Sequence, residues 1–81
     1  MINLEVETKL SVEEASKRLK SFFGKGGLGL DIVEETTECL NFAGSGGFVN
    51  AVICPAEGKT KIELQSQEWE IQVKEFASNL S

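Results

Sequence analysis

The segment LNFAGSGGFVNAVICPAEGKTKIELQ, residues 40–65, carries the clearest secondary-structure pattern of the chain. It holds two short apolar runs and one alternating run, separated by GSGG at 44–47 and PAEG at 55–58, and the glycines of both segments tolerate positive φ angles. Apolar runs bounded by such segments are typical of antiparallel strands joined by hairpins. Residues 48–54 are apolar on both sides, whereas residues 59–65 alternate with period two. The stretch therefore predicts a β-meander.

Two further strands are predicted upstream of this meander. Residues 2–10 alternate between apolar and polar side chains, and period two over such a length is typical of a half-buried strand. Residues 28–32 alternate in the same way, and residues 34–37 have the composition of a turn. The predicted meander thus gains a strand on its N-terminal side.

Two helices complete the predicted elements. Ser11 and Glu14 have the spacing of a capping box, so a helix is expected to begin after Ser11, and Gly24 is expected to end it from the left-handed cap position. Ser66 is predicted to cap a second helix. The apolar stripe of this second helix consists of Trp69, Val73, Phe76 and Leu80. The predicted order is therefore β-α-β-β-β-β-α, a single α+β domain over residues 1–81 with both helices on one face of an antiparallel sheet.

This order of elements resembles one repeat of the TATA-box-binding-protein-like fold, and it is also similar to the helix-grip fold of START and Bet v 1-like proteins. The resemblance is carried by the strand at 2–10, the helix from Ser11, the meander at 28–65 and the closing helix through Trp69 and Val73. It covers nearly the whole chain and implies the sheet order 1-5-4-3-2. The first family binds DNA on its open sheet face, and the second binds apolar ligands between helix and sheet. Because the resemblance lies in element order alone, it transfers no site residues.

The strand registers can be predicted by placing the strong hydrophobes on one face. The expected pairs are Leu40 with Ala51 and Phe42 with Val49, then Ala51 with Ile62 and Val49 with Leu64, then Ile32 with Leu40 and Leu30 with Phe42.

These registers place a polar row on the opposite face of the sheet, formed by Asp31, Asn41, Asn50 and Glu63. Such a row is a candidate site for a cation or a polar ligand. It would span roughly 14 Å across four strands, which is too wide for one ion, so only a neighbouring pair could bind one. The alternative is a row of solvated acids and amides.

The same outer face carries an apolar strip that is the main interface candidate: Val33, Cys39, Phe48, Val52 and Cys54. An uncovered apolar strip on a sheet is typical of a docking or self-association surface, and a symmetric dimer is the simplest assembly. The alternative is that these are scattered surface hydrophobes, which are normal. Cys39 and Cys54 are expected to be diagonal neighbours on this face, as structural cysteines or as a redox pair.

A second candidate site lies under the last helix. Trp69 is expected to anchor the core, or else to line an apolar groove between helix and sheet together with Phe22, Phe42 and Phe76. Such a groove would bind a small apolar ligand.

Composition excludes several classes of function. The net charge is −5, from 13 acids and 8 bases, so binding to nucleic acid or to an anionic membrane is disfavoured. The chain has no histidine, which argues against acid–base catalysis, and we assign no catalytic residues. The GKGGLG match at 24–29 follows a helix and precedes a strand, the reverse of a dinucleotide-binding turn. The segment at 44–47 joins two strands, unlike a nucleophile elbow.

No cofactor or metal is expected, because the two cysteines lack the spacing of a metal site. With no leader-like segment and no disulfide scaffold, we expect a cytoplasmic protein. The function we expect is a non-enzymatic interaction module that forms a homodimer or docks a protein partner through the open sheet face. The alternative is a small apolar-ligand-binding protein, or a small enzyme, that uses the space between the last helix and the sheet.

Overall fold

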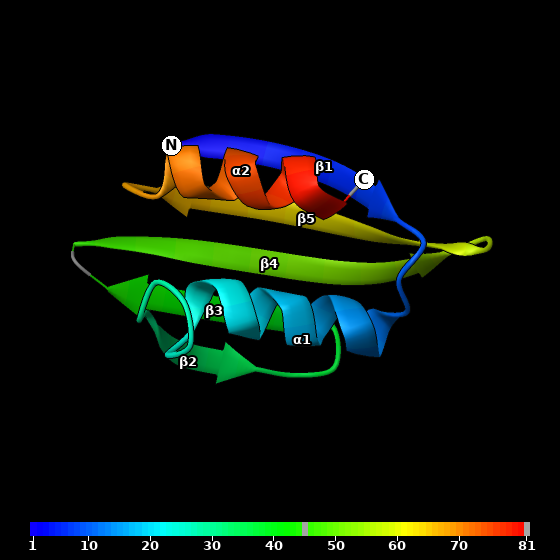
Figure 1. The fold of residues 1–81 in the computed structure, drawn as a ribbon, viewed down its shortest axis with the longest axis horizontal. Coiled ribbons are helices and arrows are strands. Elements are labelled where there is room, and N and C mark those ends of the chain that lie inside the picture. Colours follow the sequence, from blue (N-terminus) through cyan, green and yellow to red (C-terminus); the bar gives the residue numbers. More distant parts are fainter. Residues whose placement is uncertain (45, 81) are drawn as a thin grey trace.

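The computed structural model describes residues 1–44 and 46–80. Five antiparallel strands form one sheet in the order β1-β5-β4-β3-β2, which confirms the expected element order and sheet order (Figure 1). The strands are β1 (Ile2–Thr8), β2 (Asp31–Glu35), β3 (Cys39–Gly44), β4 (Gly47–Ala56) and β5 (Lys59–Gln67). The N-terminal strand therefore lies beside the C-terminal one, and the long strand β4 is central.

Both helices cover the same face of this sheet, as expected. Helix α1 (Val12–Phe23) packs on β3 and β4, and helix α2 (Glu70–Leu80) packs on β1 and β5 (Figure 1). The two helices run in opposite directions along the sheet, and among residues 1–44 and 46–80 no helix covers the opposite face.

Helix α1 begins and ends where the sequence predicts. The Glu14 N–H donates to Ser11 Oγ at 3.1 Å, which is the N-cap contact. Gly24 ends the helix as expected. Its φ is −82°, so the prediction that it would adopt the left-handed cap conformation was wrong. Glycine is needed there for space, because a Cβ at this position would overlap the Lys20 carbonyl oxygen.

Helix α2 does not begin at Ser66, and that prediction was wrong. Strand β5 continues through Gln67, and Ser66 is fully buried, with Oγ donating to the Phe48 carbonyl at 2.8 Å. Ser66 thus extends the inward-facing series of β5, and its hydroxyl is satisfied across the sheet instead of at a helix end. The chain then turns at Glu68, whose φ is +74°.

The β3–β4 register is confirmed, whereas the β4–β5 register was two residues off. Ala51 lies opposite Leu64 and Val49 lies opposite Ser66, because Glu57 and Gly58 occupy the turn. Gly58 has a φ of +67°, which glycine adopts readily, so the turn centres on this residue. A shift of the strand register by two residues keeps every side chain on the same face of the sheet. The prediction of which β4 and β5 residues face the helices is therefore confirmed.

The β2–β3 register was also wrong. Ile32 lies opposite Phe42 and Glu35 lies opposite Leu40, with a β-bulge between Ile32 and Glu34. The strand therefore covers residues 31–35 where a strand at 28–32 and a turn at 34–37 were expected. The bulge adds one residue that no alternation pattern reveals.

The core fills the space between the helices and the sheet. Phe23 is fully buried, and its ring lies 4.9 Å from that of Phe22, 5.7 Å from Phe42 and 5.4 Å from Phe76. The other buried hydrophobic residues are Ala15, Leu19, Leu30, Leu40, Val49, Ala51, Ile53, Ile62, Leu64 and Val73. Every strand except the edge strands β1 and β2 contributes fully buried hydrophobic side chains, which fixes the opposite face as the solvent-facing one.

Candidate interaction surface on the open sheet face

A row of polar side chains crosses all five strands on the face that the helices leave open. Its members lie directly opposite one another in the order Glu34, Asn41, Asn50, Gln65 and Asn3. We call these five residues the amide row. Asn41 and Asn50 were expected here, but Asp31 and Glu63 were not confirmed as members, because the registers of β2 and β5 differ from the predicted ones.

Two amides of the amide row, Asn41 and Gln65, contact side chains near them. Asn41 Nδ2 donates to Glu34 Oε1 at 2.7 Å, which bridges β3 and the edge strand β2. Gln65 Nε2 lies 3.2 Å from Met1 Sδ, a weak acceptor. Asn50, on the central strand, is partly buried between Asn41 and Gln65.

A second row runs beside the amide row and begins with two acids. Glu5 lies directly opposite Glu63, Glu63 opposite Val52, and Val52 opposite Cys39. Like charges in directly opposite positions on a sheet are destabilising. Lys61 offsets part of this repulsion, since its Nζ lies 3.1 Å from Glu5 Oε2. The hydrogen bond and charge of Glu5, aided by the charge of Glu63, raise the pKa of Lys61 above its ordinary value.

An open hollow of about 380 Å³ lies where these two rows meet. Its lining residues come from the three strands β1, β5 and β4: Asn3, Leu4, Glu5, Asn50, Val52, Glu63, Leu64 and Gln65. The polar groups of the wall are two carboxylates and three side-chain amides, a chemistry suited to a cationic hydrogen-bond donor, and Leu4, Val52 and Leu64 supply the apolar part.

The expected apolar strip is divided by the amide row. Cys39, Val52 and Cys54 are neighbours on one side of Asn50, whereas Phe48 lies on the other side, opposite Ala43. These side chains are partly buried, and each apolar group is small. They flank a polar centre and do not form one continuous patch.

Val33 is apart from the strip as well. It lies at the β2 bulge and is 64% exposed. Its exposure comes from its place on an edge strand, where no further strand covers it.

Cys39 and Cys54 are diagonal neighbours on adjacent strands, as expected, and both are free thiols. Diagonal positions have Cα atoms about 7–8 Å apart, beyond the reach of an unstrained disulfide. The arrangement therefore favours structural cysteines.

The groove candidates under the last helix occupy different environments. Phe42 is fully buried and Phe76 nearly so, within the aromatic cluster of the core. Trp69 is partly buried, and its Nε1 donates to the Gly44 carbonyl at 3.1 Å. Phe22 and Phe76 line an open hollow of about 260 Å³ between the helices, together with Arg18. The four residues thus do not share one cavity.

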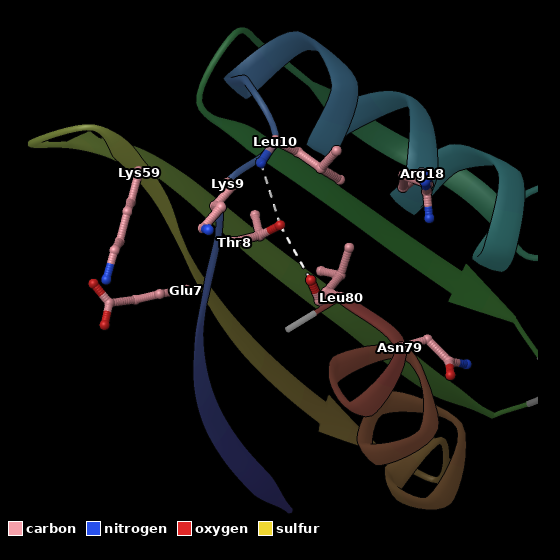
Figure 2. Close-up of a pocket in the computed structure, with 8 residues that line it drawn as sticks. All are labelled: Glu7, Thr8, Lys9, Leu10, Arg18, Lys59, Asn79 and Leu80. Atoms are coloured by element: carbon pink, nitrogen blue, oxygen red, sulfur yellow. Dashed lines mark hydrogen bonds between the residues drawn. The ribbon is translucent and has the colours of Figure 1, made fainter.

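A further hollow of about 480 Å³ lies at the end of β1, beside the last turn of α2 (Figure 2). Thr8 organises it: its Oγ1 donates to the Leu80 carbonyl at 3.2 Å and accepts from the Leu10 N–H at 3.3 Å. Lys59 and Glu7 point toward each other on one side of β1, and Leu80 lies on the other side (Figure 2). Arg18, on α1, lies on that other side as well, away from Lys59 and Glu7, so the charged groups do not converge on one ligand (Figure 2).

Several classes of site are absent from residues 1–44 and 46–80. No group of three or more Cys, Asp or Glu side chains there is arranged to hold a metal ion. Within the same residues, neither helix has the length and apolar composition needed to cross a membrane. Comparison with protein-family models and with curated proteins finds no match for the chain. The assignment of function therefore depends on the surface itself.

Sequence reasoning missed four members of the two rows: Asn3, Glu5, Glu34 and Gln65. Glu34 lay in a segment predicted as a turn, whereas Asn3, Glu5 and Gln65 occupy outward positions of alternating strands, so the face of these three was predictable. Their alignment was not, because it depends on the Gly58 turn and on the bulge beside Val33.

Proposed function

We propose that this chain is a non-enzymatic interaction domain that docks a protein partner through the open sheet face. The amide row supports this proposal most strongly. Asparagine is depleted in strands, yet Asn3, Asn41 and Asn50 lie within three strands of one sheet and in one row. A row of amides lowers the stability of the sheet and offers many hydrogen-bond donors and acceptors to a partner. Such a loss of stability in favour of binding is expected at a recognition surface.

The flanking residues support the same assignment. Phe48 lies on one side of the row, and Val52 with Cys39 on the other, each partly buried. Small apolar groups around a polar centre let a partner exclude water from the hydrogen bonds that it makes with the amides. The unpaired cysteines fit a reducing cytoplasm, where we place the protein.

Self-association through this face is the second form of the proposal. It would bring the amide rows of two copies together around a two-fold axis, since an amide can donate to and accept from its own kind. The ligand-binding alternative is less well supported, because Phe42 and Phe76 are packed into the core and the hollow beside Phe22 is small.

Affinity capture with matched lysine variants tests the proposal. Val52→Lys adds a charge to the centre of the open face, and Ser78→Lys adds the same charge at an exposed position of α2. Both variants and the wild type serve as bait in an extract of the cells that make the protein, after urea unfolding has shown that each is folded. We expect partners recovered with wild type and Ser78→Lys to be depleted at least tenfold with Val52→Lys.

Two results would contradict the proposal. One is a set of partners that Val52→Lys retains in full, and the other is an equal loss with Ser78→Lys. Sedimentation of the purified proteins separates the two forms of the proposal, because only self-association gives a wild-type dimer that Val52→Lys dissociates.

A further inference from the structure

We propose that the partner inserts an arginine side chain into the hollow between Glu5 and Glu63. This inference rests on the proposed docking function of the open face and specifies its occupant. It commits to a basic protein segment in preference to a second copy of this chain.

The charge of the open face is the first argument. The outward positions of the strands carry five carboxylates and two lysines: Glu5, Glu7, Asp31, Glu34 and Glu63 against Lys59 and Lys61. Two copies placed face to face would oppose these carboxylates at short range, which is unfavourable. A basic segment would instead meet a surface of complementary sign, which also speeds its association.

The facing pair of acids is the second argument. Glu5 and Glu63 are directly opposite, and Lys61 bonds only to Glu5. Among the described residues, Glu63 makes no ion pair. A cation placed between the two carboxylates would therefore relieve the part of their repulsion that Lys61 does not offset.

The shape of the hollow is the third argument. Glu5, Glu63, Gln65 and Asn3 form the corners of a rectangle about 4.8 Å across the strands and about 7 Å along them. Two carboxylates occupy one side and two side-chain amides, each with one acceptor oxygen, the other. A guanidinium group is planar and has five N–H donors directed outward, so it can reach acceptors on both sides, whereas an ammonium is a compact point charge. Val52, at the edge of the hollow, would contact the aliphatic part of the arginine.

A peptide titration followed by NMR tests this inference on the whole chain. The probe is the capped pentapeptide Ala-Ala-Arg-Ala-Ala, added to ¹⁵N-labelled protein to millimolar concentrations. The same peptide with citrulline in place of arginine keeps the shape of the side chain and removes its charge. The peptide with lysine keeps the charge and removes the planar guanidinium group. We expect the arginine peptide to shift the amide signals of Glu5, Asn50, Val52, Glu63 and Gln65, with weaker effects from lysine and none from citrulline.

A variant of the hollow and a control variant outside it, each lacking one carboxylate, complete the test. Glu63→Gln removes one carboxylate of the hollow, and Glu13→Gln removes an exposed carboxylate on α1. We expect Glu63→Gln to weaken binding about three- to fivefold, as for an exposed charge pair, and Glu13→Gln to leave it unchanged.

Three results would overturn the inference: shifts spread evenly over the surface, equal binding by the lysine peptide, or equal loss in both variants. If the peptide fails while Val52→Lys still loses partners in affinity capture, the arginine assignment is wrong and the docking function stands. If both fail, the docking function is wrong as well.

Discussion

Replacement of Asn50 by valine should stabilise the free protein while weakening its interactions. Asn50 lies at the middle of the central strand β4, partly buried, and none of the hydrogen bonds among the described residues involves its side chain. Asparagine is among the residues depleted in strands and valine among those enriched, on a scale that spans about 1 kcal/mol. We therefore expect Asn50→Val to raise the free energy of unfolding by about 0.5–1 kcal/mol, or Tm by roughly 2–8 °C.

Urea unfolding followed by circular dichroism measures this effect, with an unchanged m-value as the sign of an unchanged fold. Asn41→Val is the matched control, because the Asn41 side chain donates to Glu34 and its removal gives up that hydrogen bond. The gain from Asn41→Val should therefore be smaller. A loss of 1 kcal/mol or more with Asn50→Val would show that the amide is structural, and the argument that the amide row is kept for recognition would fail.

Three further predictions concern the fold. Phe23→Ala should cost about 3–5 kcal/mol in urea unfolding, and Phe22→Ala less than half as much, because only Phe23 is fully buried; similar costs would contradict the described core. Glu68→Gly should stabilise by about 1 kcal/mol, since Glu68 has a φ of +74°, and thermal unfolding that shows no gain would argue against a strained turn. In an NMR titration, the pKa of Glu70 should lie below its ordinary value because of its backbone hydrogen bond at the start of α2, with a further contribution from the Met1 ammonium 3.5 Å away. Its contribution to stability is then present above the ordinary pKa and lost as pH falls through the lowered one, so Glu70→Gln should reduce the acid sensitivity of unfolding.

The sequence predicts the order of elements because each one carries a strong local pattern. Residues 2–10 alternate, Ser11 caps α1, and the glycines near 44–47 and at Gly58 separate strands. These signals concern neighbours in the chain, so they do not require knowledge of the fold. They were sufficient to predict which face of the sheet is buried.

The candidate site was only partly predictable, because it depends on alignment between strands. Moving the turn by one residue to Glu57 and Gly58 places Gln65 opposite Asn50, where Glu63 was expected. The bulge beside Val33 likewise places Glu34 opposite Asn41, where Asp31 was expected. Ser66 was misassigned because a serine before a helix can serve as a cap or can bond across the sheet, and only the tertiary structure decides between these roles.

Site-specific photo-cross-linking shows whether the open sheet face is a docking surface. A photoreactive amino acid is placed at Asn50 on the open face or at Lys17 on the exposed side of α1, and the protein is irradiated in the cells that make it. We expect a discrete cross-linked product from position 50 that position 17 does not give, and we expect this product to be lost when Val52→Lys is added. Cross-links from position 17 alone, or the same products from both positions, would contradict the proposed docking surface.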